Sequence, residues 1–143
     1  MKPCVSEQLQ YYNLLTSEID EAYHNASLKL GLSDSAMMIL YALCSRENPC
    51  PLLEIAKLTG ISRQTIHSAI KKLEAQGILT LESPGGRRKL VRLTEEGMEL
   101  AEKTAGRLIK IFDSWTGEEL EQYIRLTGRY LEQFREKTGR LGV

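Results

Sequence analysis

Side chains that can bind phosphate or contact a base are concentrated in the middle of this sequence. Residues 57–92 contain eight basic and two acidic residues, a net charge of +6, although the whole chain of 143 residues is neutral. The rest of the chain contains 11 basic and 17 acidic residues, so its net charge is −6. A basic segment between acidic ends indicates a polyanionic partner. On charge alone, a solvated face with counter-ions explains the segment equally well.

A helix-turn-helix pattern runs through this basic segment. The first helix is expected at residues 53–59 and the second at residues 62–76, with Gly60 making the turn and Ser62 capping the second helix. Ala56 is small enough to let the two helices cross closely. The predicted buried stripe of the second helix consists of Ile66, Ala69, Ile70 and Leu73.

Burial of that stripe would turn the opposite face of the second helix outward. This face has cations and short polar groups that can reach base edges and phosphates in a DNA major groove. The helix N-terminus also offers free N–H groups to a phosphate. The predicted DNA contacts on this helix are Ser62, Arg63, Gln64, Thr65, His67, Ser68, Lys71 and Lys72. An ordinary helical hairpin with a polar outer face is the competing explanation, because such patterns also occur by chance.

A β-hairpin with a cationic tip follows the two helices directly. Residues 78–82 and 89–93 alternate as strands do, on either side of a turn at residues 83–86. Three successive cations repel one another, but they suit a phosphate backbone or a minor groove. These predicted DNA contacts are Arg87, Arg88 and Lys89. The helix pair and the hairpin in series predict a winged helix-turn-helix that binds double-stranded DNA.

The rest of the chain is predicted to be helical. Apolar residues recur at helical spacing over residues 6–29, from Ser33 to about Cys44, in one long helix from Thr94 to about Trp115, and in a last helix that Thr116 would cap. The predicted fold is mainly α with a small β-hairpin wing.

The boundaries follow from these elements. We expect a single domain over residues 1–143, with the DNA-binding region at 32–97 and flanking helices at 6–29 and 98–138.

Three segments resemble the MarR family of bacterial transcriptional regulators. They are Ile55–Leu73, Lys72–Leu79 and Arg87–Gly97, and the likeness extends over about residues 32–97. The flanking helices match the family only in order and length. The resemblance implies a homodimer that pairs through its first and last helices and presents two recognition helices to a pseudo-palindromic operator. We therefore predict a DNA-binding regulator, a repressor that an unknown small-molecule effector releases.

The wing departs from the family at one position. Family members commonly have Asp-x-Arg there, and the matching residues are Gly85 and Arg87. Arg87 is thus present without the acid that would orient it, so the helix contacts are the firmer expectation. Aromatic residues at both chain ends agree with a dimer, although a buried core explains them as well. They are Tyr11, Tyr12, Tyr23, Trp115, Tyr123, Tyr130 and Phe134.

Enzymatic and metal-binding functions find little support in the sequence. It contains no phosphate-binding Gly-rich loop, no G-x-S-x-G and no H-E-x-x-H, so catalysis is not expected. His24 and His67 stand far apart, which argues against a zinc site, and no cofactor is predicted. No apolar run approaches the ~18 residues of a membrane span, and the N-terminus lacks a secretory h-region. We expect a cytoplasmic protein with no membrane partner.

Two alternatives remain open. The first is a thiol-based redox sensor on the same scaffold, because Cys4 lies just before the first helix, where some members of the family sense oxidants. Cys44 is expected in the core instead, since it falls on an apolar stripe. The second alternative is a winged helix used for protein contact without DNA, against which the cationic wing argues.

Overall fold

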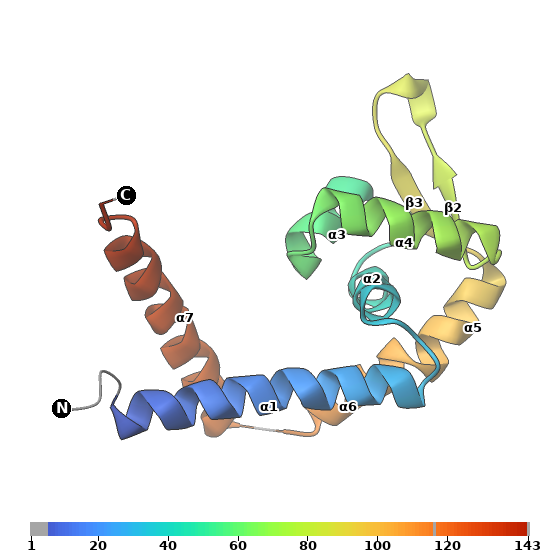
Figure 1. Ribbon diagram of the computed structural model, residues 1–143. Coiled ribbons are helices and arrows are strands. Elements are labelled where there is room, and N and C mark those ends of the chain that lie inside the picture. Colours follow the sequence, from blue (N-terminus) through green and yellow to red (C-terminus); the bar gives the residue numbers. More distant parts are fainter. Residues whose placement is uncertain (1–5, 116, 143) are drawn as a thin grey trace. The chain divides into compact units, whose positions relative to one another are not determined.

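The computed structural model of the chain describes residues 6–115 and 117–142. The chain divides into two compact units, one ending at Leu108 and the other beginning at Ile109, and each is described by itself. The first unit contains the predicted winged helix-turn-helix, and the second consists mainly of one long helix (Figure 1).

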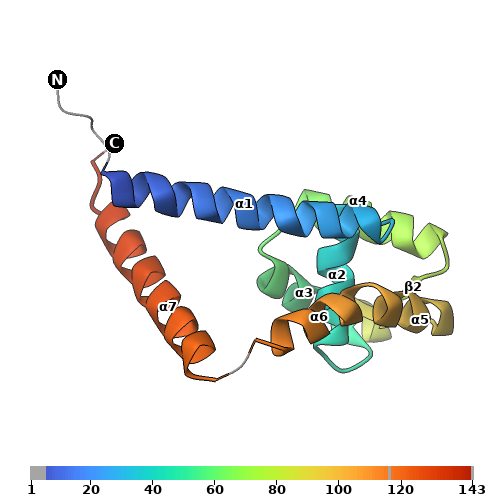
Figure 2. The same ribbon diagram turned by 90° about the horizontal axis from the view of Figure 1, so that it is seen from below.

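Helix α2 (Asp34–Cys44) forms the centre of the first unit. Its hydrophobic residues Ile39, Leu40 and Ala42 are fully buried, and helices on several sides contact it. Ser33 caps the helix, because its hydroxyl accepts the Ala36 N–H at 3.2 Å. Helix α1 (Glu7–Lys29) lies across α2, as Figure 2 shows.

The two helices of the predicted motif pack against α2. Helix α3 (Leu52–Thr59) ends at Gly60, whose φ of 65° places it in the left-handed region that favours glycine. Helix α4 (Arg63–Ala75) then begins at its cap, Ser62. The residues that α4 buries are Ile66, Ala69, Ile70 and Leu73, which confirms the predicted stripe.

The wing belongs to an antiparallel sheet of three strands. Strands β2 (Leu79–Glu82) and β3 (Leu90–Leu93) form the predicted hairpin. The sequence analysis missed β1 (Cys50–Pro51), which pairs with the other side of β3, so the strand order is β1-β3-β2. Pro51 is the second residue of this strand. An edge strand tolerates a proline, because its outer side needs no N–H donor.

Thr94 and Gly97 hold helix α5 (Glu95–Lys103) close to the start of the wing. Thr94 caps α5, and its hydroxyl donates to the Gly77 carbonyl at 2.6 Å while its N–H donates to the Ile78 carbonyl at 3.1 Å. A Cβ on Gly97 would lie 1.9 Å from that Ile78 oxygen, so only glycine fits. The end of α4, the wing and α5 are therefore fixed to one another by backbone contact.

The prediction of one long helix after the wing is wrong. Thr104, with φ −118° and ψ −87°, separates α5 from helix α6 (Ala105–Asp113). Its buried hydroxyl donates to the Leu100 carbonyl at 2.6 Å. The break therefore lies at a β-branched residue whose backbone angles leave the helical region.

The second unit contains helix α7 (Glu118–Thr138), which follows Gly117. The predicted cap, Thr116, lies outside the described residues.

No single helix among the described residues is long and apolar enough to cross a membrane. Helices α1 and α2 meet that test only when taken together, and the pair is bent by 89°.

Candidate nucleic-acid interface

Helix α4 presents an unbroken polar face opposite its buried stripe. Its predicted contact residues all lie on the exposed side, and the buried residues between them fix the rotation of the helix. The exposed set is Ser62, Arg63, Gln64, Thr65, His67, Ser68, Lys71 and Lys72. All eight residues are therefore exposed, and they are distributed over the part of the helix surface that the buried stripe leaves free.

Two of these residues also stabilise the helix end. The Ser62 hydroxyl accepts the Thr65 N–H at 3.3 Å and donates to the Thr65 hydroxyl at 2.9 Å. Both hydroxyls are thus engaged within the helix. Arg63 and Gln64 lie between Ser62 and Thr65 in the chain, and their side chains are longer hydrogen-bond donors.

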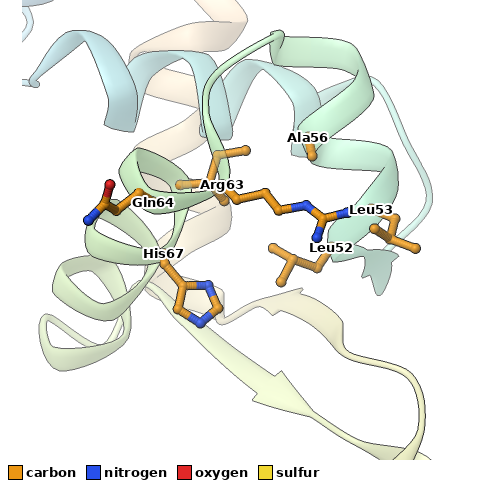
Figure 3. Close-up of a pocket in the computed structure, with 7 residues that line it drawn as sticks. Leu52, Leu53, Ala56, Arg63, Gln64 and His67 are labelled. Carbon is orange, nitrogen blue, oxygen red and sulfur yellow. The ribbon is translucent and has the colours of Figure 1, made fainter.

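Three of the predicted contacts line a shallow, open cavity of about 410 Å³ between α3 and α4. Figure 3 shows the Arg63 side chain extending across it toward Leu52 and Leu53, whereas Gln64 points away from them. The lining residues are Leu52, Leu53, Ala56, Arg63, Gln64, Ile66 and His67. The sequence analysis did not single out Leu52 and Leu53. Two successive leucines at a helix start are informative, because residues 100° apart cannot both face the core.

The wing cations lie apart from the α4 face, in the loop between β2 and β3. Arg87, Arg88 and Lys89 are all exposed, and the hairpin projects beyond α4 (Figure 1). Gly85 and Gly86 make the turn with φ of 69° and 73°. The result is an extended arm with its cations near the tip.

A fourth wing cation is already paired. The Arg92 guanidinium donates to the Glu82 carboxylate across the two strands, with Nε–Oε1 at 2.5 Å and Nη2–Oε2 at 3.4 Å. Hydrogen bonding to Arg92 lowers the pKa of Glu82, and the same bond raises the pKa of Arg92. Arg92 therefore stabilises the hairpin, and its charge is partly neutralised.

These features agree with the known family to which the sequence is similar. The sequence profile of the MarR family matches residues 30–89, from the end of α1 to the wing tip. Residues 30–89 therefore resemble the winged helix of the MarR family.

Solved structures of MarR-family regulators share the fold over most of the chain. A regulator from Rhodococcus sp. RHA1 is 18% identical, with a TM-score of 0.68, and the match covers 91% of this chain and 96% of that one. PcaV from Streptomyces coelicolor, solved with its natural ligand, is also 18% identical, with a TM-score of 0.68 and coverage of 91% and 98%.

A third structure adds a regulated example. BpsR from Bordetella bronchiseptica, whose DNA binding is regulated by 6-hydroxynicotinic acid, is 20% identical with a TM-score of 0.65, and the match covers 90% of this chain and 99% of that one. Among curated proteins, no significant match to the sequence is found. The predicted fold, mainly α with a winged helix-turn-helix, is confirmed.

The cysteines give no support to a redox site within the described residues. The prediction that Cys44 belongs to the core is wrong: it is exposed at the end of α2, and Cys50 is the buried one. The apolar stripe predicted for α2 includes Cys44, but the helix buries the preceding residue, Leu43. Desolvation by surrounding protein atoms raises the pKa of both thiols, which disfavours the reactive thiolate. Cys4 lies outside the described residues.

No group of three or more metal-ligating side chains occurs in the described part of the chain. His24 pairs instead with Asp34, its Nδ1 lying 2.9 Å from Oδ2, and so joins α1 to the first turn of α2.

Proposed function

We propose that this chain is a sequence-specific DNA-binding transcriptional regulator that uses α4 as its recognition helix. The exposed polar face of α4 carries the proposal, because the buried stripe behind it holds that face in one orientation. Arg63 and Gln64 near the helix N-terminus suit guanine and adenine respectively in a major groove. Lys71 and Lys72, further along, suit phosphates.

The wing supports the same proposal. Its three exposed cations would contact the phosphate backbone beside the groove that α4 enters. Because Gly85 replaces the acid common at this position in the family, Arg87 would serve mainly as a phosphate contact.

Apolar side chains on α1 and α7 support a homodimer acting on a pseudo-palindromic operator. Each helix exposes a series of large hydrophobic residues that a second copy would cover. On α1 these include Leu9, Tyr12, Leu15, Ile19 and Tyr23, and on α7 they include Tyr123, Ile124, Tyr130, Leu131 and Phe134. Two copies would then present two copies of α4 to the DNA.

The likeness to PcaV and BpsR supports release by a small-molecule effector, since these structures concern a natural ligand and 6-hydroxynicotinic acid. The proposed action is repression relieved by such an effector. A protein of this function works in the compartment that holds the DNA, which is the cytoplasm predicted from the sequence. No enzymatic activity is part of the proposal.

Selection of bound DNA from random oligonucleotides tests the recognition helix. Arg63→Ala and Gln64→Ala should each relax preference at one base pair per half-site, by about 1–3 kcal/mol. Lys71→Ala should weaken binding to all sequences alike. Arg107→Ala, an exposed change on α6, is the matched control and should leave binding unchanged. If Arg63→Ala and Gln64→Ala keep every wild-type base preference, α4 is not the reading element.

A further inference from the structure

We propose that the cavity between α3 and α4 is a thymine-reading site, in which Leu52 and Leu53 receive the C5-methyl group of a thymine next to the base that Arg63 contacts. This inference rests on the proposed function and names a specificity determinant outside the recognition helix. The observation behind it is that the cavity joins apolar residues of α3 to polar residues of α4 on one surface.

The position of Leu53 is unusual for a hydrophobic residue on a DNA-facing surface. Its side chain is 64% exposed, whereas Leu52 is half-buried against the core. A single exposed leucine is ordinary in itself. Here it forms one wall of a cavity whose opposite wall contains Arg63, Gln64 and His67. If the bound DNA offered only polar groups here, the side chain of Leu53 would gain no apolar contact on binding.

Duplex DNA offers one apolar group on the base edges of the major groove, the thymine methyl. The apolar part of the cavity, made by Leu52, Leu53, Ala56 and Ile66, can remove that methyl from water. The positive charge of Arg63 in the same cavity suits a polyanionic partner. The cavity is also continuous with the α4 face, because Arg63, Gln64 and His67 belong to both.

The side-chain directions place this thymine relative to the other bases. Arg63 extends toward Leu52 and Leu53, and Gln64 points away from them (Figure 3). A methyl held by the leucines would therefore lie beside the base that Arg63 reads and not beside the base that Gln64 reads. The site takes a T adjacent to the Arg63-dependent position in each half-site.

Deoxyuridine differs from thymidine only by lacking this methyl, so it is the probe. Each T of the selected operator is replaced by deoxyuridine in turn, and the affinity of the full-length protein is measured. One T per half-site, next to the Arg63-dependent base pair, should lose about 3- to 5-fold in affinity, the value of one buried methyl. Leu53→Ala should weaken binding to the T operator by a similar factor and bind the T and deoxyuridine operators equally.

Leu58→Ala is the matched control, because Leu58 is another exposed leucine of α3 but does not line the cavity. It should retain the full deoxyuridine penalty. The inference is overturned if no single T shows a penalty, or if Leu53→Ala keeps it. It is also overturned if benzoate, a small aromatic anion, displaces DNA from the wild type but not from Leu53→Ala while the penalty stays unchanged, since the cavity would then bind an effector. Absence of any sequence preference would instead remove the proposed function itself.

Discussion

The winged helix and helix α7 differ in how far they bury their apolar side chains. In the winged helix, α2 and the facing sides of α3, α4 and the sheet bury residues such as Ile39, Ile55, Ile66 and Val91 almost completely. Within its own unit, α7 buries none of its residues, and Ile124, for example, is 57% exposed. One region therefore has a hydrophobic core of its own, and the other exposes apolar residues that its own unit does not cover.

This difference implies that the two regions respond to different perturbations. A change inside the winged helix should alter the free energy of unfolding directly. A change on the apolar face of α7 should act on association, because the residues that cover it in the proposed dimer belong to a second copy. The predictions below test this distinction, beginning with the largest effect.

Substitution of glycine by alanine should separate the two regions most clearly. Gly97→Ala would force a Cβ against the Ile78 carbonyl oxygen and should lower the free energy of unfolding by about 3 kcal/mol or more, measured by chemical denaturation. Gly128→Ala in α7 is the matched control. It has open space around it and should instead raise helix stability by up to about 1 kcal/mol. A Gly97→Ala protein as stable as the wild type would contradict the close contact between α5 and Ile78.

A charge on the apolar face of α7 should dissociate the proposed dimer. Leu131→Asp would bury a carboxylate at the interface and should raise the dimer dissociation constant at least about 100-fold, as followed by light scattering across a dilution series. Gln122→Asp adds the same charge at an exposed polar position of α7 and should leave the mass unchanged. A wild-type mass of one chain at micromolar concentration would sink the dimer altogether.

Removal of the wing cations should change the salt dependence of binding more than its sequence preference. If about four cations per protomer meet phosphates, a dimer should give a slope of roughly −7 in log K against log salt. The triple change Arg87→Ala, Arg88→Ala and Lys89→Ala should make that slope shallower by roughly 5, because it removes six cations from the dimer.

The control for the wing removes the same charge elsewhere. The triple change Lys103→Ala, Arg107→Ala and Lys110→Ala affects exposed cations of α5 and α6 and should keep the wild-type slope. An unchanged slope in the wing variant would show that the wing does not lie on the phosphate backbone.

The smallest expected effect concerns the Glu82–Arg92 pair. Because the pKa of Glu82 is lowered in the folded protein, its contribution to stability is complete above the ordinary carboxyl pKa. That contribution is lost as the pH falls through the lowered value. Glu82→Gln should therefore melt slightly below the wild type at neutral pH, and the difference should vanish in acid. A melting difference that is the same at both pH values would mean that the ion pair is not its cause.

The sequence predicted the winged helix well because its elements are locally encoded. Gly60 makes the turn, Ser62 caps α4, and the spacing of Ile66, Ile70 and Leu73 fixes which face is buried. Each of these properties depends on residues a few positions apart. Errors arose where the pattern was compatible with two structures, as at Cys44, whose apolar stripe could be drawn one residue to either side.

Contacts between residues far apart in the chain could not be read from the sequence. The pairing of β1 with β3 joins Cys50 to Val91, which no local pattern reveals. The cavity likewise requires Leu53 and Arg63 to meet across two helices.

By itself, then, the sequence determined the order of the elements, the polar face of α4 and the cationic wing, since helix and strand periodicity specify which side chains share a face. It also carried the resemblance to the MarR family. Only the tertiary structure showed why residue 97 must be glycine, that Glu82 pairs with Arg92, and which leucines lie beside Arg63. The physical reason is that these properties depend on distances between separate elements, and those distances are set only when the core packs.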